Sequence, residues 1–118
     1  MTLSIIRKQS KADRLAVCQE LADRIPESFR PLAVIWGWIQ KPGNSFLLPI
    51  IVDQIAAASD TYVRVWPIKS RDFEVTGFDR EAMLKVLEDL RSAWAGIVEV
   101  TWKEEGALIN LYLKPYSP

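Results

Sequence analysis

The chain of 118 residues has five tryptophans, one cysteine and no histidine. The absence of histidine excludes the side chain that most often titrates near neutral pH and most often binds metals, and a single cysteine excludes an intrachain disulfide and a thiolate zinc site. Fifteen basic and fifteen acidic residues cancel, which weakens any general attraction to nucleic acid or to anionic membranes.

The first predicted helix covers residues 10–25. Ser10 is placed as its N-cap with Asp13 three residues later, as in a capping box. Apolar side chains then recur at helical spacing as far as Ile25. Pro26 ends the helix, because proline lacks an N–H and clashes with the preceding turn.

Two apolar runs, residues 32–40 and 46–52, come next and are predicted to be strands. The Lys-Pro-Gly-Asn sequence between them is typical of a turn, so the two runs predict a hairpin. Pro49 lies inside the second run and indicates an edge position or a bulge. Residues 53–60 give no clear pattern, and their Ile-Ala-Ala-Ala sequence is compatible with one helical turn.

Alternating residues then predict two more strands, a clear one over residues 62–68 and a weaker one over 72–76. The second helix has the strongest signals in the chain. Asp79 is placed as its N-cap, an apolar stripe runs to Trp94, which is predicted to be buried, and Gly96 is placed to cap the C-terminus.

A hairpin is predicted to follow, with strands over residues 98–103 and 109–114 and a turn at 104–106. Strict apolar–polar alternation is typical of a sheet with one covered and one open face, and Trp102 is predicted on the covered face. The element order predicts an α+β protein, a mostly antiparallel sheet of about five to seven strands with two helices packed on one face. The length is typical of one globular domain, residues 1–118.

Aromatic residues on the predicted strands give the main candidate for a binding surface. In a strand, Trp36 and Trp38 point to the same side, which fits either a central strand buried on both faces or part of an open face. In the strand over 62–68, Arg64 is expected on the same side as Tyr62 and Trp66. The two valines between them are expected on the other side, which the helices cover. Aligned, these faces form an aromatic platform for stacking bases or packing against a protein. The expected binding residues are Trp36, Trp38, Tyr62, Arg64, Trp66 and Tyr112.

Two basic clusters are candidate phosphate-binding residues under a nucleic-acid interpretation. The favoured interpretation is that they are solvated, because short charged runs usually face water. The clusters are Arg7, Lys8, Lys11 and Arg14 near the first helix, and Lys69 and Arg71 after the strand over 62–68.

Carboxylates are the main remaining side chains for catalysis, yet their pattern predicts no site. Asp53, Asp60 and Asp72 fall in or near predicted loops, where aspartate is common, and nothing in their spacing requires them to converge. Cys18 lies on the apolar side of the first helix with no histidine to activate it, so it is predicted to be a buried packing residue. No catalytic residue is assigned.

The aromatic content and the missing catalytic residues favour a non-catalytic binding domain, a subunit or adaptor that contacts another protein or a second copy of itself. The alternative is an RNA or single-stranded nucleic-acid module that uses the same aromatic face, and a third interpretation is a small carboxylate-based enzyme. We expect no metal, no cofactor and no membrane partner. The absence of a signal sequence and of a disulfide framework predicts a cytoplasmic location.

Overall fold

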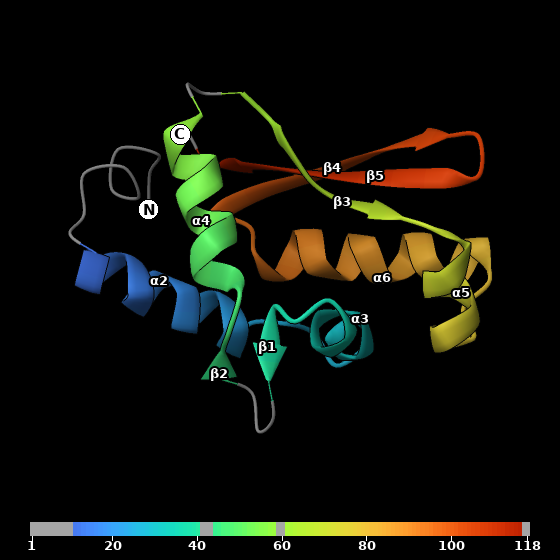
Figure 1. Ribbon diagram of the computed structural model, residues 1–118, viewed down its shortest axis with the longest axis horizontal. Coiled ribbons are helices and arrows are strands. Elements are labelled where there is room, and N and C mark those ends of the chain that lie inside the picture. Colours follow the sequence, from blue (N-terminus) through green and yellow to red (C-terminus); the bar gives the residue numbers. More distant parts are fainter. Residues whose placement is uncertain (1–10, 41–43, 59–60, 117–118) are drawn as a thin grey trace.

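The computed structural model describes residues 11–40, 44–58 and 61–116, without the side chains of 11–13 and 44–45. Three of its five strands form one sheet, the other two form a very short hairpin, and the helices pack against these elements (Figure 1). The helices are α2 (Lys11–Asp23), α3 (Arg30–Ile35), α4 (Leu48–Ala57), α5 (Ser70–Thr76) and α6 (Arg80–Ala93). The strands are β1 (Ile39–Gln40), β2 (Asn44–Ser45), β3 (Val63–Ile68), β4 (Val98–Glu105) and β5 (Leu108–Pro115).

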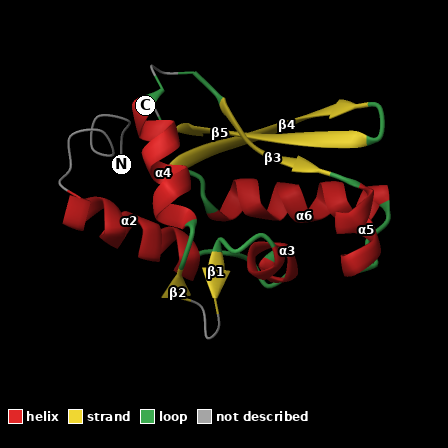
Figure 2. Ribbon diagram, in the orientation of Figure 1, coloured by secondary structure: helices red, strands yellow, loops and turns green. Residues whose placement is uncertain are grey.

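The main sheet is antiparallel with strand order β3-β5-β4, so the last strand in the sequence is the central one. Figure 2 shows the helices gathered on one side of this sheet, with α6 running beneath the strands and α3 beyond it. The opposite face carries no helix of the described chain. The α+β class and the antiparallel sheet are therefore confirmed, but the main sheet has three strands instead of the predicted five to seven, and the described chain has five helices instead of two.

The two apolar runs predicted as strands are mostly helical. Residues 32–35 belong to α3 and residues 48–52 to α4; only the two-residue pairing of β1 with β2 remains of the predicted hairpin. Both helices have a proline within their first two positions, Pro31 in α3 and Pro49 in α4. Proline is favoured there because the first helical N–H groups have no partner in the helix. Pro49 thus marks the start of a helix, and the predicted edge or bulge there is wrong.

The weak strand predicted over residues 72–76 is also wrong, since these residues form most of α5. The side chain of Asp72 accepts a hydrogen bond from the backbone N–H of Lys69, which stabilises the first turn. Gly77 ends the helix with φ at +75°, a left-handed conformation that glycine adopts without a Cβ clash. The alternation of apolar and polar residues over five positions predicted a strand, but Asp72 and Gly77 stabilise the two ends of a helix here.

The elements predicted from both a hydrophobic periodicity and a capping or turn residue are confirmed. Helix α2 lies inside the predicted 10–25, although the Ser10–Asp13 cap falls outside the described side chains. Helix α6 begins as expected, with Asp79 accepting a hydrogen bond from the N–H of Ala82. The closing hairpin extends further than predicted, because β4 continues to Glu105 and the turn is centred on Gly106, with φ at +61°.

An aromatic cluster occupies the middle of the core. The rings of Phe29, Trp36 and Trp38 contact one another at 5.2–5.6 Å between centroids. Trp94 stacks on Trp38 at 5.9 Å, and its indole N–H donates to the carbonyl of Leu21. Around this cluster pack the buried apolar side chains of α2, α4, α6 and the covered face of the sheet. Trp36, Trp38 and Trp94 are therefore core residues.

Candidate binding groove

A β-bulge in β3 decides which aromatic residues face solvent. Arg64 pairs with Tyr112 in β5, but the register then shifts and Trp66 pairs with Leu111. Neighbouring residues of β5 point to opposite faces, so Arg64 lies on the open face with Tyr112 while Trp66 lies on the covered face with buried Leu111. The expectation that Arg64 and Trp66 share one face is wrong, because the extra residue inverts the alternation.

Trp36 and Trp38 are not part of the open sheet face either. Trp36 caps the C-terminus of α3 and Trp38 follows Gly37, whose φ of +77° turns the chain between them. Trp36 is 3% exposed and Trp38 is fully buried. Trp36, Trp38 and Trp66 are therefore not part of the predicted aromatic platform. Of the predicted aromatic residues, only Tyr62 and Tyr112 lie on the open face with Arg64.

The open face carries several polar side chains that contact one another. The ammonium of Lys114 lies 5.1 Å from the ring of Tyr62 and forms an ion pair with Glu99 at 3.3 Å. The ammonium of Lys103 lies 5.5 Å from the ring of Tyr112. Cross-strand pairs of this kind are typical of a solvated sheet face. Tyr62, Arg64 and Tyr112 are on this face as predicted, but their neighbours already occupy the two tyrosine rings.

A groove beside β3 is the stronger candidate for a site. It is an open cavity of about 530 Å³ between the end of β3, the C-terminus of α3 and the start of α5. Its lining combines apolar and cationic side chains with one buried carboxylate. The lining residues are Ile35, Trp36, Val65, Trp66, Pro67, Lys69, Arg71 and Asp72.

The floor of the groove is a stack of two indoles. Trp66 is partly buried and lies on Trp36, with ring centroids 4.8 Å apart and planes 23° from parallel. The indole N–H of Trp36 donates a hydrogen bond of 2.9 Å to Oδ1 of Asp72, and Oδ2 of Asp72 accepts the N–H of Lys69 at 2.9 Å. The carboxylate thereby joins the floor to the segment that carries the cations. The stacked rings and the two hydrogen bonds of Asp72 link β3, α3 and α5 around the groove.

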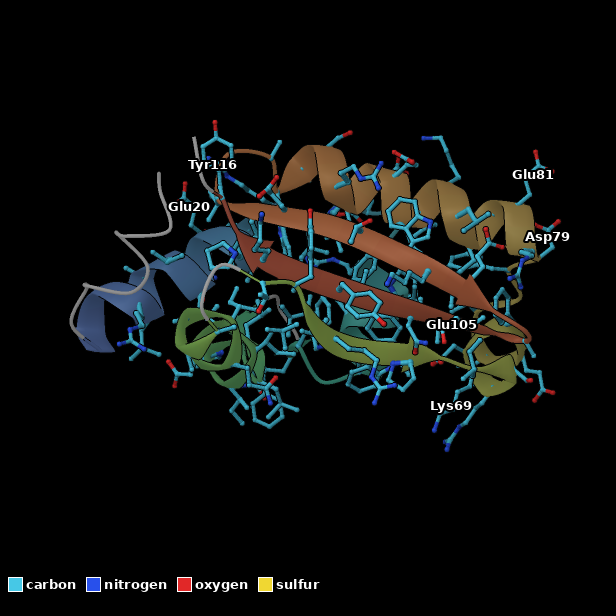
Figure 3. All side chains as sticks on the ribbon, turned by 90° about the horizontal axis from the view of Figure 1, so that it is seen from above. Glu20, Lys69, Asp79, Glu81, Glu105 and Tyr116 are labelled. Atoms are coloured by element: carbon cyan, nitrogen blue, oxygen red, sulfur yellow. The ribbon has the colours of Figure 1, made fainter. Side chains whose placement is uncertain are left out.

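The cations beside the groove form no ion pair with any side chain that the structure describes. Lys69 and Arg71 form no ion pair among the described side chains, and neither does Arg64 on the adjoining strand. Every other lysine or arginine with a described side chain forms an ion pair or, for Lys103, lies over an aromatic ring. Figure 3 shows Lys69 extending outward beyond the end of β3. Among the described residues, the positive charges without an ion pair or aromatic contact thus lie along one edge of the sheet.

Exposed aliphatic side chains border the same region. Ile35 is 45% exposed at the end of α3, where it lines the groove, and Val34 beside it is exposed as well. Val75 on α5 is 55% exposed, and α5 packs against α3. Large apolar side chains that cluster at the surface beside a concave site are typical of binding surfaces.

The remaining predicted residues do not form a second site. Arg7, Lys8 and Asp60, and the side chain of Lys11, lie outside the described part of the chain. Arg14 pairs with Asp53 at 3.1 Å. Asp53 and Asp72 line different cavities, so the structure does not bring these two carboxylates together. No cluster of metal-ligating side chains occurs among the described residues, and no helix in that part of the chain is long and apolar enough to cross a membrane.

Another cavity of about 380 Å³ lies beside the first half of β4. The guanidinium of Arg91 in its lining donates to the carbonyl of Val100, pairs with Glu88 and lies 4.3 Å from the ring of Trp102. Glu99, also in the lining, pairs with Lys114. These two charged groups are already partnered, which distinguishes this cavity from the groove beside β3.

Cys18 is buried, as predicted, and its reactivity is expected to be low. Burial raises the pKa of the Cys18 thiol from 9.0 to about 11, and the negative charge of Asp53 adds to the shift. We expect thiol reagents at pH 8 to label the folded protein far more slowly than the urea-unfolded chain. Because the folded pKa is the higher one, the stabilisation from this group is complete below pH 9 and is lost as the pH rises through about 11. Labelling of the folded protein at the rate of the unfolded chain would contradict the burial of this thiol.

The sequence predicts Trp66 as a residue of the aromatic face and Lys69 and Arg71 as a separate basic cluster, but it does not predict that the three line one groove. Ile35 and the hydrogen-bonding role of Asp72 were missed. The signals that point to them are Pro31, which starts the helix that presents Ile35, and the Lys-Ser-Arg-Asp sequence, in which Asp72 falls at the third position of a helix. Comparisons with family models, with curated proteins and with solved structures gave no match for this chain.

Proposed function

We propose that this chain is a non-catalytic protein-binding domain, a subunit or adaptor whose binding site is the groove beside β3. The observation that carries the proposal is the combination, in one cavity, of a stacked indole floor, an exposed aliphatic rim and two cations that form no ion pair with a described side chain. Interfaces are enriched in tryptophan and arginine, and their strongest contacts are rigid aromatic anchors in pockets.

A protein partner fits the groove better than a nucleic acid. Single-stranded nucleic acid is bound by successive aromatic platforms along a positively charged track. Here the described groove offers one partly exposed indole, Trp66, with aliphatic walls from Ile35, Val65 and Pro67. Such walls complement apolar side chains, and the net charge of zero adds no wider attraction for phosphates.

The test is a selection of random linear peptides displayed on phage against the purified full chain, followed by affinity measurements on variants. Ile35→Ser is the groove variant, and Ile50→Ser is its matched control, because Ile50 is the same residue type on α4 and is similarly exposed at 56%. We expect peptides whose affinity falls about tenfold or more with Ile35→Ser and changes less than about twofold with Ile50→Ser.

Peptides that bind both variants equally, or no enriched peptide at all, would contradict the proposal. Light scattering on the same proteins adds a second readout. A dimer that Ile35→Ser dissociates and Ile50→Ser does not would retain the binding function and identify a second copy as the occupant.

A further inference from the structure

We propose that the partner of the groove is an acidic linear segment, which places a bulky apolar side chain on Trp66 and carboxylates against Lys69 and Arg71. This inference rests on the proposed function and specifies the chemistry of its partner.

Charge complementarity favours acid on the partner. Covering Lys69 and Arg71 removes water from two cations that have no carboxylate of their own among the described residues. A partner without negative charge leaves them unpaired and partly desolvated, and a basic partner adds repulsion. Asp72 does not supply the missing charge, because its two oxygens accept from Trp36 and from the backbone of Lys69. The cations therefore select for carboxylates on the partner.

The interrupted edge of β3 indicates recognition through side chains. A free strand edge usually binds peptides by extending the sheet with backbone hydrogen bonds. In β3 the bulge between Arg64 and Trp66 breaks the register, and Pro67 has no N–H to donate. Two of the features that proteins use to blunt an edge strand are thus present where the groove lies. A partner then depends on the groove's side chains for affinity.

A second copy of the chain is a poor occupant. In an isologous dimer the same patch lies on both subunits across a two-fold axis. A dimer centred on the groove places Lys69 and Arg71 of one copy toward the same cations of the other. This repulsion opposes self-association, whereas an acidic segment from another protein removes it.

The peptide selection tests the charge of the partner when it is repeated on a charge-reversed protein. Lys69→Glu/Arg71→Glu reverses the charge of the groove. Arg24→Glu/Lys85→Glu is the control, with the same change in net charge at two exposed positions, one just after α2 and one on α6. Arg24 and Lys85 form only surface ion pairs, which contribute little to stability. Circular dichroism on all three proteins verifies that each is folded.

We expect peptides that depend on Ile35 to be enriched in aspartate and glutamate beside an aromatic or aliphatic residue. Their affinity for Lys69→Glu/Arg71→Glu is expected to fall about tenfold or more, with less than a twofold change in the control, and selection on the reversed groove should lose the acidic enrichment. Rising salt is expected to weaken the wild-type complex.

Two results overturn the inference while leaving the proposed function intact: Ile35-dependent peptides that are neutral or basic, and a dimer that Ile35→Ser dissociates. A single-stranded oligonucleotide of mixed sequence is the second probe. Binding of this oligonucleotide that Lys69→Glu/Arg71→Glu abolishes, with no Ile35-dependent peptide enriched, would assign the groove to nucleic acid and overturn both.

Discussion

Replacing Trp94 with alanine is expected to lower the free energy of unfolding by about 3–5 kcal/mol, a large part of the stability of a domain this size. The side chain is fully buried and stacks on Trp38, so its removal leaves a cavity in the middle of the aromatic cluster. It also leaves the carbonyl of Leu21 without the indole N–H that donates to it at 3.0 Å. Urea unfolding followed by far-UV circular dichroism measures the change.

Trp102→Ala is the matched comparison and is expected to cost about 2 kcal/mol. Trp102 lies on the covered face of β4 as predicted, but it is partly exposed and its ring contacts the guanidinium of Arg91 at 4.3 Å. Equal losses for the two variants would show that the aromatic cluster is no more tightly packed than the edge of the sheet.

Removing the carboxylate of Asp72 is expected to destabilise the fold by about 2–3 kcal/mol. In Asp72→Ala the buried indole N–H of Trp36 and the backbone N–H of Lys69 both lose their acceptor. Glu74→Ala is the control on the same helix; Glu74 is exposed and has no described ion pair, so a change within about 0.5 kcal/mol is expected. Urea unfolding of both variants gives the comparison.

A double-mutant cycle with Trp36→Phe separates the hydrogen bond from other effects of Asp72. Phenylalanine keeps an aromatic ring against Trp66 but has no N–H for the carboxylate. The cost of Asp72→Ala is therefore expected to be smaller in the Trp36→Phe background than in the wild type. Strict additivity of the two substitutions would show that the Trp36–Asp72 contact contributes nothing to stability.

Sequence patterns identified the elements that carry both a period and an end signal. Asp79 and the following apolar stripe define α6, and strict alternation around Gly106 defines β4 and β5. Helices α3 and α4 were missed because continuous apolar runs have no period that separates a buried strand from a buried helix. Their prolines are the available discriminator, since Pro31 and Pro49 fit a first helical turn and interrupt a strand.

The groove was not predictable from local patterns, because its position depends on one residue of register. A regular strand over residues 62–68 places Trp66 beside Arg64, and only the bulge turns it toward Trp36 and the core. The contacts that Trp66 makes after the bulge are tertiary ones, since it stacks on Trp36, whose indole N–H donates to Asp72, and local sequence patterns do not report such contacts. The types of the groove residues indicated binding, but the sequence did not predict that they lie together.

The strand order β3-β5-β4 has a consequence for synthesis on the ribosome. Neither β3 nor β4 pairs with the other, and both depend on β5, which follows them in the chain. A nascent chain that has emerged only as far as Glu105 holds two strands without a partner and a helix α6 without the sheet that covers it. Chains exposed in this way are prone to aggregate until the missing strand arrives. The three-stranded sheet can therefore form only after residues 108–115 have left the exit tunnel.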